Sequence, residues 1–190
     1  MVSIGNPVMD VALLGGKKVV DEYLEKSKNI GIDILEISSI ARSIDDDDMC
    51  RLIENISEKG IKVLNEIGIA FAHSEVDDES IFIERLKNQS KKFLNAGSWK
   101  ILLESEGLTE NLNKENFRWN IIDKIISPLK LSEFMVEADD QDVLCKYVEM
   151  YGPNINMMVD HTRLLKMEDA RLGYGPVSYT HLTLPTTTIV

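Results

Sequence analysis

Five short apolar runs in this chain each end in a carboxylate, and the spacing of these acids predicts how the chain folds. The acids are Glu36, Glu66, Glu104, Glu137 and Asp160, and 23 to 38 residues separate each from the next. A gap of that length holds one amphipathic helix and the return of the chain, as in the strand–helix units of a parallel sheet. Because parallel strands end at one edge of the sheet, we expect the acids to gather there.

The rest of the hydrophobic pattern agrees with six strand–helix units. It predicts strands over residues 2–6, 32–37, 61–67, 99–104, 133–137 and 154–160, with helices near 17–29, 49–56, 77–95, 115–126, 140–150 and 162–172. This alternation is typical of an α/β fold, either a TIM (β/α)8-type barrel or an open doubly wound sheet. The barrel is favoured, because no Gly-x-Gly-x-x-Gly loop follows a strand and the acids recur at five strand ends instead of one switch point.

A barrel has eight units, so six units predict that this chain holds strands 3–8 and lacks the first two. On that interpretation residues 1–175 form a partial barrel, which we expect to be inactive and to express insolubly because its sheet has two open edges. Residues 176–190 contain five threonines and no acidic residue, lysine or arginine. They are interpreted as an artefactual, vector-like tail, with a genuine flexible tail as the alternative.

Composition excludes several classes of partner. The formal net charge of −11 argues against nucleic acid and anionic membranes, and no apolar run approaches the roughly 18 residues of a membrane span. Two cysteines without metal-ligand spacing are typical of reduced thiols in a cytoplasmic protein. A homo-oligomer is compatible with these features.

Four consecutive acids, residues 45–48, precede the helix that carries Met49, Ile53 and Ile56. Acids at this position favour a helix N-terminus by capping it and by interacting with the helix dipole. A solvated cap is therefore the preferred interpretation, and a metal-binding cluster is the alternative.

Several segments resemble the phosphosulfolactate synthase family. The run Tyr-Gly-Pro-Asn-Ile-Asn-Met-Met-Val-Asp-His-Thr at 151–162 is similar to the family's Gly-Pro-x-Val-Asn-Leu-x-Val-Asp-His-Ser, and Arg171 matches a family arginine. Residues 103–111 resemble a Glu-Ser-Glu-Gly-Ile-Thr-Glu-Asn element. Residues 34–38, 62–68 and 134–138 resemble further family strands, so the likeness extends in order over about 2–175.

The resemblance implies a TIM barrel that adds sulfite to phosphoenolpyruvate to give (2R)-phospho-3-sulfolactate with Mg²⁺, as in coenzyme M biosynthesis. Both substrates are anions, and a divalent cation would offset the repulsion from a ring of carboxylates. The metal ligands expected are Glu36, Glu66, Glu104 and Glu137, and the catalytic residues expected are Glu104, Glu106 and Asp160.

Six further residues are candidates for binding the substrate and its phosphate: Lys17, Arg42, Asn156, His161, Thr162 and Arg163. Thr162 and Arg163 follow the last strand, a frequent phosphate seat in such barrels. Asn156 shares a strand face with Asp160. A structural histidine is the preferred interpretation of His161, and plain surface charge is the alternative for Lys17 and Arg42.

The chain departs from the archaeal members at residues 68–70, where Gly-Ile-Ala replaces Gly-Lys-Lys. A lysine there is a natural proton donor. Either another group supplies the proton, such as Lys17 or a lysine in the N-terminal part that we expect this chain to lack, or this branch acts on something else, which keeps two other functions open. One is a non-catalytic, stress-associated relative, as plant members are regarded. The other is a Mg²⁺-dependent barrel lyase or aldolase acting on a different phosphorylated substrate.

Overall fold

The computed structural model describes residues 1–190 apart from 2, 6, 39–43, 69–78, 139 and 175–190. Six parallel strands form one sheet in the order β1-β2-β3-β4-β5-β6. They are β1 (Ser3–Ile4), β2 (Ile34–Ser38), β3 (Lys62–Ile67), β4 (Lys100–Leu103), β5 (Phe134–Glu137) and β6 (Met157–Met158). The order lacks the reversal of a doubly wound sheet. The α/β architecture and parallel sheet are as predicted, whereas assignment to strands 3–8 of an eight-stranded barrel stays a prediction.

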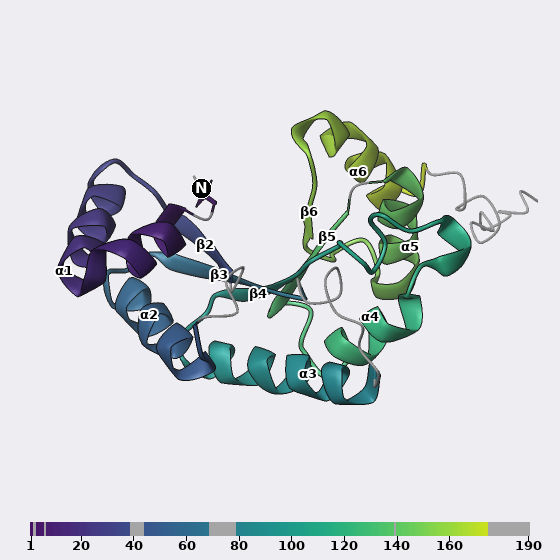
Figure 1. The fold of residues 1–190 in the computed structure, drawn as a ribbon. Helices are drawn as coiled ribbons and strands as arrows, with labels where there is room; N and C mark the ends of the chain where they lie inside the picture. The colour runs from purple at the N-terminus through teal and green to yellow at the C-terminus, as the bar shows by residue number, and fades with distance from the viewer. Residues whose placement is uncertain (2, 6, 39–43, 69–78, 139, 175–190) are drawn as a thin grey trace, which may run out of the picture.

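A helix follows each strand. The helices are α1 (Pro7–Asn29), α2 (Asp46–Glu58), α3 (Glu79–Asn95), α4 (Trp119–Ile126), α5 (Gln141–Tyr151) and α6 (Leu164–Arg171), with 3₁₀ turns η2 (Lys114–Asn116) and η3 (His161–Arg163). In Figure 1 the strands form an arc, and α2, α3, α4 and α5 lie along its outer side. Among the described residues, no helix combines the length and apolarity needed to cross a membrane.

The two faces of the sheet bury different side chains. Toward the helices, Leu35, Val63 and Ile101 belong to the large core, together with helix residues such as Ile53 and Ile122. On the opposite face, Ile34, Leu64 and Leu102 form a small apolar layer with Trp99, Met135 and Met158 against it. Because side chains alternate along a strand, residues two positions further on from this layer also project from the concave face.

The register of the strands brings the acids to one level. Glu36 pairs with Leu64, two residues before Glu66, and Glu66 pairs with Leu102, two residues before Glu104. Each acid therefore lies two residues further along its strand than the position that pairs with the previous acid. Because strands of a curved parallel sheet are tilted, this shift keeps the acids at a similar height. The carboxylates consequently lie in a row above the apolar layer.

Three elements differ from the sequence prediction. The first helix begins at Pro7 instead of 17, and Gly16, with φ 66° and ψ 177°, breaks it internally. The last strand spans only Met157–Met158 instead of 154–160. The predicted helix over 115–126 is divided into η2 and α4, because Phe117 adopts an extended conformation between them.

Candidate active site

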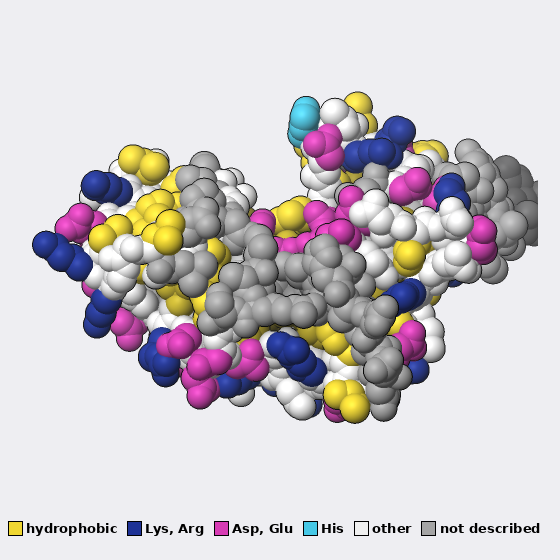
Figure 2. All heavy atoms as spheres, viewed as in Figure 1, with side chains coloured by type: hydrophobic (Ala, Val, Ile, Leu, Met, Phe, Trp, Pro, Cys, Tyr) yellow, Lys and Arg dark blue, Asp and Glu magenta, His cyan; other side chains and the backbone are white. Residues whose placement is uncertain are grey.

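Four predicted metal ligands lie on the concave face near the C-terminal ends of their strands. Glu36 belongs to β2, Glu66 to β3 and Glu137 to β5, while Glu104 directly follows β4. Glu66 is only 8% exposed. Figure 2 shows acidic side chains gathered on the concave side, close to the region that contains β4 and β5.

Burial raises the pKa of three of these acids, and the neighbouring carboxyl groups add to the effect. Burial raises the pKa of Glu36, and the charge of Glu137 adds to the effect. Burial raises the pKa of Glu66, with further contributions from the charges of Glu36 and Glu137, although hydrogen bonds to Glu104 and Ser38 oppose the shift. Burial and a hydrogen bond with Glu66 raise the pKa of Glu104 to about 7. Like-charged carboxyl groups in a low-dielectric site favour an added proton or a cation.

A tight loop after β4 supplies a fifth acid. The Ser105 carbonyl oxygen accepts bonds from the N–H groups of Leu108, Thr109 and Glu110 at 2.9, 2.9 and 3.0 Å. Leu108 is fully buried and anchors the loop. The chain therefore turns back, and Glu106 and Glu110 form an isolated parallel bridge.

Glu110 consequently joins the strand-end acids. One carboxylate oxygen each from Glu104, Glu110 and Glu137 lies within 4.8 Å of the other two. All three donors are oxygen, the ligand atom that Mg²⁺ prefers. Among the described residues, no ion pair involves Glu36, Glu66 or Glu104. The oxygen donors of Glu104, Glu110 and Glu137 fit a hard divalent cation.

Sequence reasoning did not assign a role to Glu110. The signal was present, because Glu110 lies six residues after Glu104 in the Glu-Ser-Glu-Gly-Leu-Thr-Glu element, and Gly107 at φ 73° permits the turn between them. Glu106 was assigned a catalytic role instead. Its backbone N–H lies 3.4 Å from Glu104 Oε1, and its half-buried side chain is not part of the three-carboxylate cluster.

Asp160 caps the turn η3 after β6. It accepts hydrogen bonds from the backbone and hydroxyl of Thr162 at 2.9 and 2.6 Å, which lower its pKa. His161 Nδ1 lies 3.3 Å from Asp160 Oδ2 and its side chain is 86% exposed. Arg163 is half-buried at the start of α6. These residues form a local turn whose hydrogen bonds stabilise an ionised Asp160.

The remaining predicted substrate-binding residues have other surroundings. The Asn156 side-chain amide donates to the carbonyl oxygens of Leu131 and Phe134 at 2.7 and 3.0 Å, which supports the chain entering β5. Lys17 is exposed on α1, where it lines a groove with Asp48 and Arg51 of α2. Arg42 lies outside the described residues.

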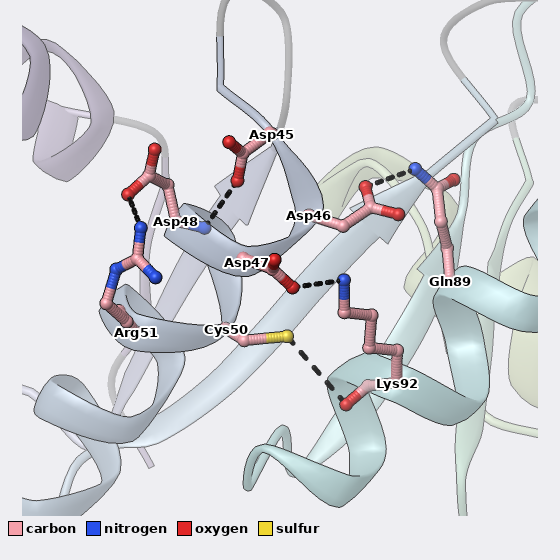
Figure 3. Close-up of polar contacts among 8 residues, drawn as sticks. All are labelled: Asp45, Asp46, Asp47, Asp48, Cys50, Arg51, Gln89 and Lys92. Carbon is pink, nitrogen blue, oxygen red and sulfur yellow. Dashed lines mark hydrogen bonds and ion pairs between the residues drawn. The ribbon is translucent and has the colours of Figure 1, made fainter.

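The run of acids at 45–48 forms the helix N-terminus that the sequence indicated. Asp45 caps α2 by accepting from the Asp48 N–H at 2.8 Å. Figure 3 shows the other three side chains pointing toward separate partners. Gln89 Nε2 lies 2.8 Å from Asp46, Lys92 Nζ lies 2.6 Å from Asp47, and Arg51 pairs with Asp48. This arrangement confirms the cap and does not gather the four acids around one ion.

Comparison with known proteins adds a family to this geometry. A family model described as (2R)-phospho-3-sulfolactate synthase (ComA) matches residues 1–175. The Arabidopsis thaliana protein HEAT-STRESS-ASSOCIATED 32 is 23% identical over 176 residues, covering 84% of this chain and 61% of that protein. The phosphosulfolactate synthase of Methanothermobacter thermautotrophicus is 25% identical over 160 residues, covering 80% and 59%. The chain thus spans about three fifths of the length of these relatives.

Solved structures agree on the fold. A putative phosphonomutase from Burkholderia cenocepacia superposes with a TM-score of 0.51 at 13% identity, covering 83% of this chain and 64% of that one. At this identity the likeness concerns the backbone fold alone. It places the chain among TIM-barrel-like α/β proteins.

Proposed function

Since the chain belongs to the (2R)-phospho-3-sulfolactate synthase (ComA) family, we propose that its carboxylate cluster binds Mg²⁺ and serves the addition of sulfite to phosphoenolpyruvate. The observation that carries this proposal is the convergence of Glu104, Glu110 and Glu137, whose oxygens lie within 4.8 Å of one another. Family membership indicates a lyase-type enzyme. The reaction, the metal and the substrates are the parts proposed here.

Glu104, Glu110 and Glu137 would hold the cation, with Glu36 and Glu66 beside them. When bound, Mg²⁺ would supply positive charge that lets two anionic substrates approach a carboxylate-rich site. Without a cation, burial and mutual repulsion keep the pKa values of Glu36, Glu66 and Glu104 raised. The raised pKa values of these three acids support the proposal, because a bound cation would favour their ionised forms.

The addition joins the sulfur of sulfite to C3 of phosphoenolpyruvate and delivers one proton to C2. A general acid must supply that proton. Glu106 is the proposed donor. It lies two residues after Glu104, close to the proposed cation site, and its carboxyl group is not one of the three in the cluster. Asp160 suits this role less well, since the Thr162 hydrogen bonds lower its pKa and favour the ionised form. Arg163, Thr162 and His161 are proposed to contact the substrate's anionic groups.

The test is to incubate the chain, and any longer gene product that contains it, with phosphoenolpyruvate, sulfite and Mg²⁺. Phosphosulfolactate is then followed by mass spectrometry. We expect product from the longer gene product, and we expect it to disappear on chelation with EDTA and in Glu104→Gln. The 190-residue chain alone is expected to be inactive, as the partial-barrel interpretation requires. Glu115→Gln, an exposed acid on η2, is the matched control and is expected to retain activity. Divalent-metal binding without product would contradict the proposed reaction while leaving the cation site intact.

A second candidate function rests on a specific departure from the archaeal members. The Gly-Ile-Ala at residues 68–70 lacks the lysine pair of that branch, and the plant relative is described as heat-stress-associated. Retained metal binding with no turnover of phosphoenolpyruvate would favour a lyase for another phosphorylated substrate. Loss of both would favour a non-catalytic relative.

A further inference from the structure

Ser105 lies at the centre of the carboxylate cluster and is only 1% exposed. Its hydroxyl oxygen is 3.0 Å from Glu110 Oε2 and 3.1 Å from Glu137 Oε2. Its backbone N–H is 3.1 Å from Glu104 Oε1 and 3.3 Å from Glu137 Oε2. One residue thus contacts all three acids of the cluster.

We propose that Ser105 is the positioning residue of this site, and that its hydroxyl, donating to one carboxylate at a time, holds the loop acid Glu110 beside the strand acid Glu137 in a geometry ready for one divalent cation. The inference rests on the proposed function, because it assumes that the cluster binds a cation. It assigns to Ser105 an action through its neighbours, without contact to the cation.

Glu110 is the acid that most needs such a contact. It is exposed and belongs to a loop, whereas Glu104 and Glu137 are half-buried beside the sheet. A glutamate side chain loses considerable rotamer freedom when it is held in one conformation. The Ser105 hydroxyl holds the Glu110 carboxylate before the cation arrives, so part of that entropy is lost on folding instead of on binding.

The same residue also shapes the loop backbone. Its carbonyl oxygen accepts three N–H groups, including that of Glu110 at 3.0 Å, so backbone and side chain of Ser105 both direct Glu110 toward the cluster. Mg²⁺ demands near-ideal octahedral geometry, which makes its binding sensitive to the placement of ligands. Residues that orient metal ligands typically contribute 10–100-fold in affinity.

The experiment measures Mn²⁺ binding to the chain by electron paramagnetic resonance, with thermal unfolding in EDTA as the measure of structure. Ser105→Ala and the nearly isosteric Ser105→Cys remove the hydroxyl, and Ser105→Thr restores one. Ser98→Ala is the matched control, because Ser98 is buried at the opposite end of β4 and its hydroxyl has no partner among the described residues.

We expect Ser105→Ala and Ser105→Cys to weaken Mn²⁺ binding about tenfold, Ser105→Thr to recover most of it, and Ser98→Ala to bind as the unaltered chain does. Glu110→Gln should also weaken binding, but by a smaller factor when Ser105 is already Ala. If Ser105 were merely structural, replacing it would lower thermal stability. Its effect on Mn²⁺ affinity would then multiply independently with that of Glu110→Gln.

The possible failures are distinguishable. If the unaltered chain shows no saturable Mn²⁺ binding, the proposed function is wrong and this inference falls with it. If the unaltered chain binds Mn²⁺ and the Ala and Cys variants bind equally well, Ser105 does not position the ligands and the proposed cation site stands. Multiplicative effects of Ser105→Ala and Glu110→Gln likewise overturn the positioning role.

Discussion

Gly68 lies directly against Glu104: a Cβ atom at position 68 would be 3.4 Å from Glu104 Cβ and 3.3 Å from Leu103 Cδ1. Gly68 directly follows β3 and has φ 107°, a conformation that residues with side chains rarely adopt. The end of one strand therefore leaves the space in which the acid of the next strand is placed.

This contact predicts that Gly68→Ala weakens cation binding as well as stability. The positive φ should cost about 1 kcal/mol or more of unfolding free energy. The added methyl group would be tight against Leu103 Cδ1 at 3.3 Å, and the adjustment of Leu103 should shift the adjacent Glu104. The control is Gly31→Ala, because Gly31 has φ 87° and nothing within 4 Å of its ideal Cβ. Urea unfolding should show both variants destabilised, whereas a Mn²⁺ titration should show weaker binding only for Gly68→Ala.

The raised pKa of Glu104 predicts that stability falls as pH rises. Its pKa is about 7 in the folded chain against an ordinary 4.5, so the folded state binds more protons between these values. Unfolding free energy should decrease across this window, by at most ~1.4 kcal/mol per pH unit and less after solvent screening. Denaturant unfolding of the metal-free chain at several pH values measures the slope. Glu104→Gln should flatten it, and a slope unchanged by that substitution would contradict the assignment.

The raised pKa of Glu104 also predicts that protons compete with a divalent cation for its carboxylate. Since a cation binds the ionised carboxylates, Mn²⁺ affinity should increase as pH rises toward and through about 7, with proton release on binding. Isothermal titration calorimetry in buffers of different ionisation enthalpy measures the released protons. Affinity independent of pH from 5 to 8 would show that Glu104 is not a ligand.

Asn65 predicts a stabilising substitution on the other face of the sheet. It is fully buried between Ile37 and Ile101, and neither side-chain amide atom has a hydrogen-bond partner among the described residues. Asn65→Leu removes this unsatisfied group while keeping the number and branching of the side-chain heavy atoms, and should raise the unfolding free energy by about 1–2 kcal/mol if the core accommodates the larger methyl groups. Asn55→Leu is the contrast, because Asn55 donates to Asp21 at 3.0 Å and should gain nothing. Chemical denaturation measures the unfolding free energy of each variant. A lower value for Asn65→Leu than for the unaltered chain would contradict the prediction.

The N-cap of α2 predicts a further effect on stability. Asp45→Ala removes the acceptor for the Asp48 N–H and should cost about 1 kcal/mol of unfolding free energy. Asp45→Asn keeps an oxygen acceptor and should cost less. Equal losses in the two variants, measured by thermal unfolding, would indicate that charge matters more here than the hydrogen bond.

The sequence predicted the strand–helix order and the row of acids well, because both follow from hydrophobic periodicity and from the common direction of parallel strands. It placed Glu36, Glu66, Glu104 and Glu137 at strand ends, and the structure has Glu66, Glu104 and Glu137 at or beside the ends of their strands, with Glu36 in the middle of β2. Glu110 escaped prediction because its position depends on a loop that folds back through three hydrogen bonds to one carbonyl oxygen. Such a turn leaves no hydrophobic periodicity in the sequence from which its fold could be predicted.

Asn156 illustrates a different limit. Strand alternation predicted which face it shares with Asp160, but not that two backbone carbonyl groups near the start of β5 would occupy its amide. The early start of α1 was missed for a related reason. Gly15 and Gly16 indicated a loop, and the structure instead continues the helix on both sides of a single non-helical residue.

Glu104, Glu110 and Glu137 all come from residues 104–137, a contiguous stretch that joins two neighbouring strands. The cluster is therefore inherited as one piece of sequence. Substitutions confined to the other loops of the described structure would therefore leave all three proposed cation ligands in place, whereas a deletion within this stretch would remove or separate them.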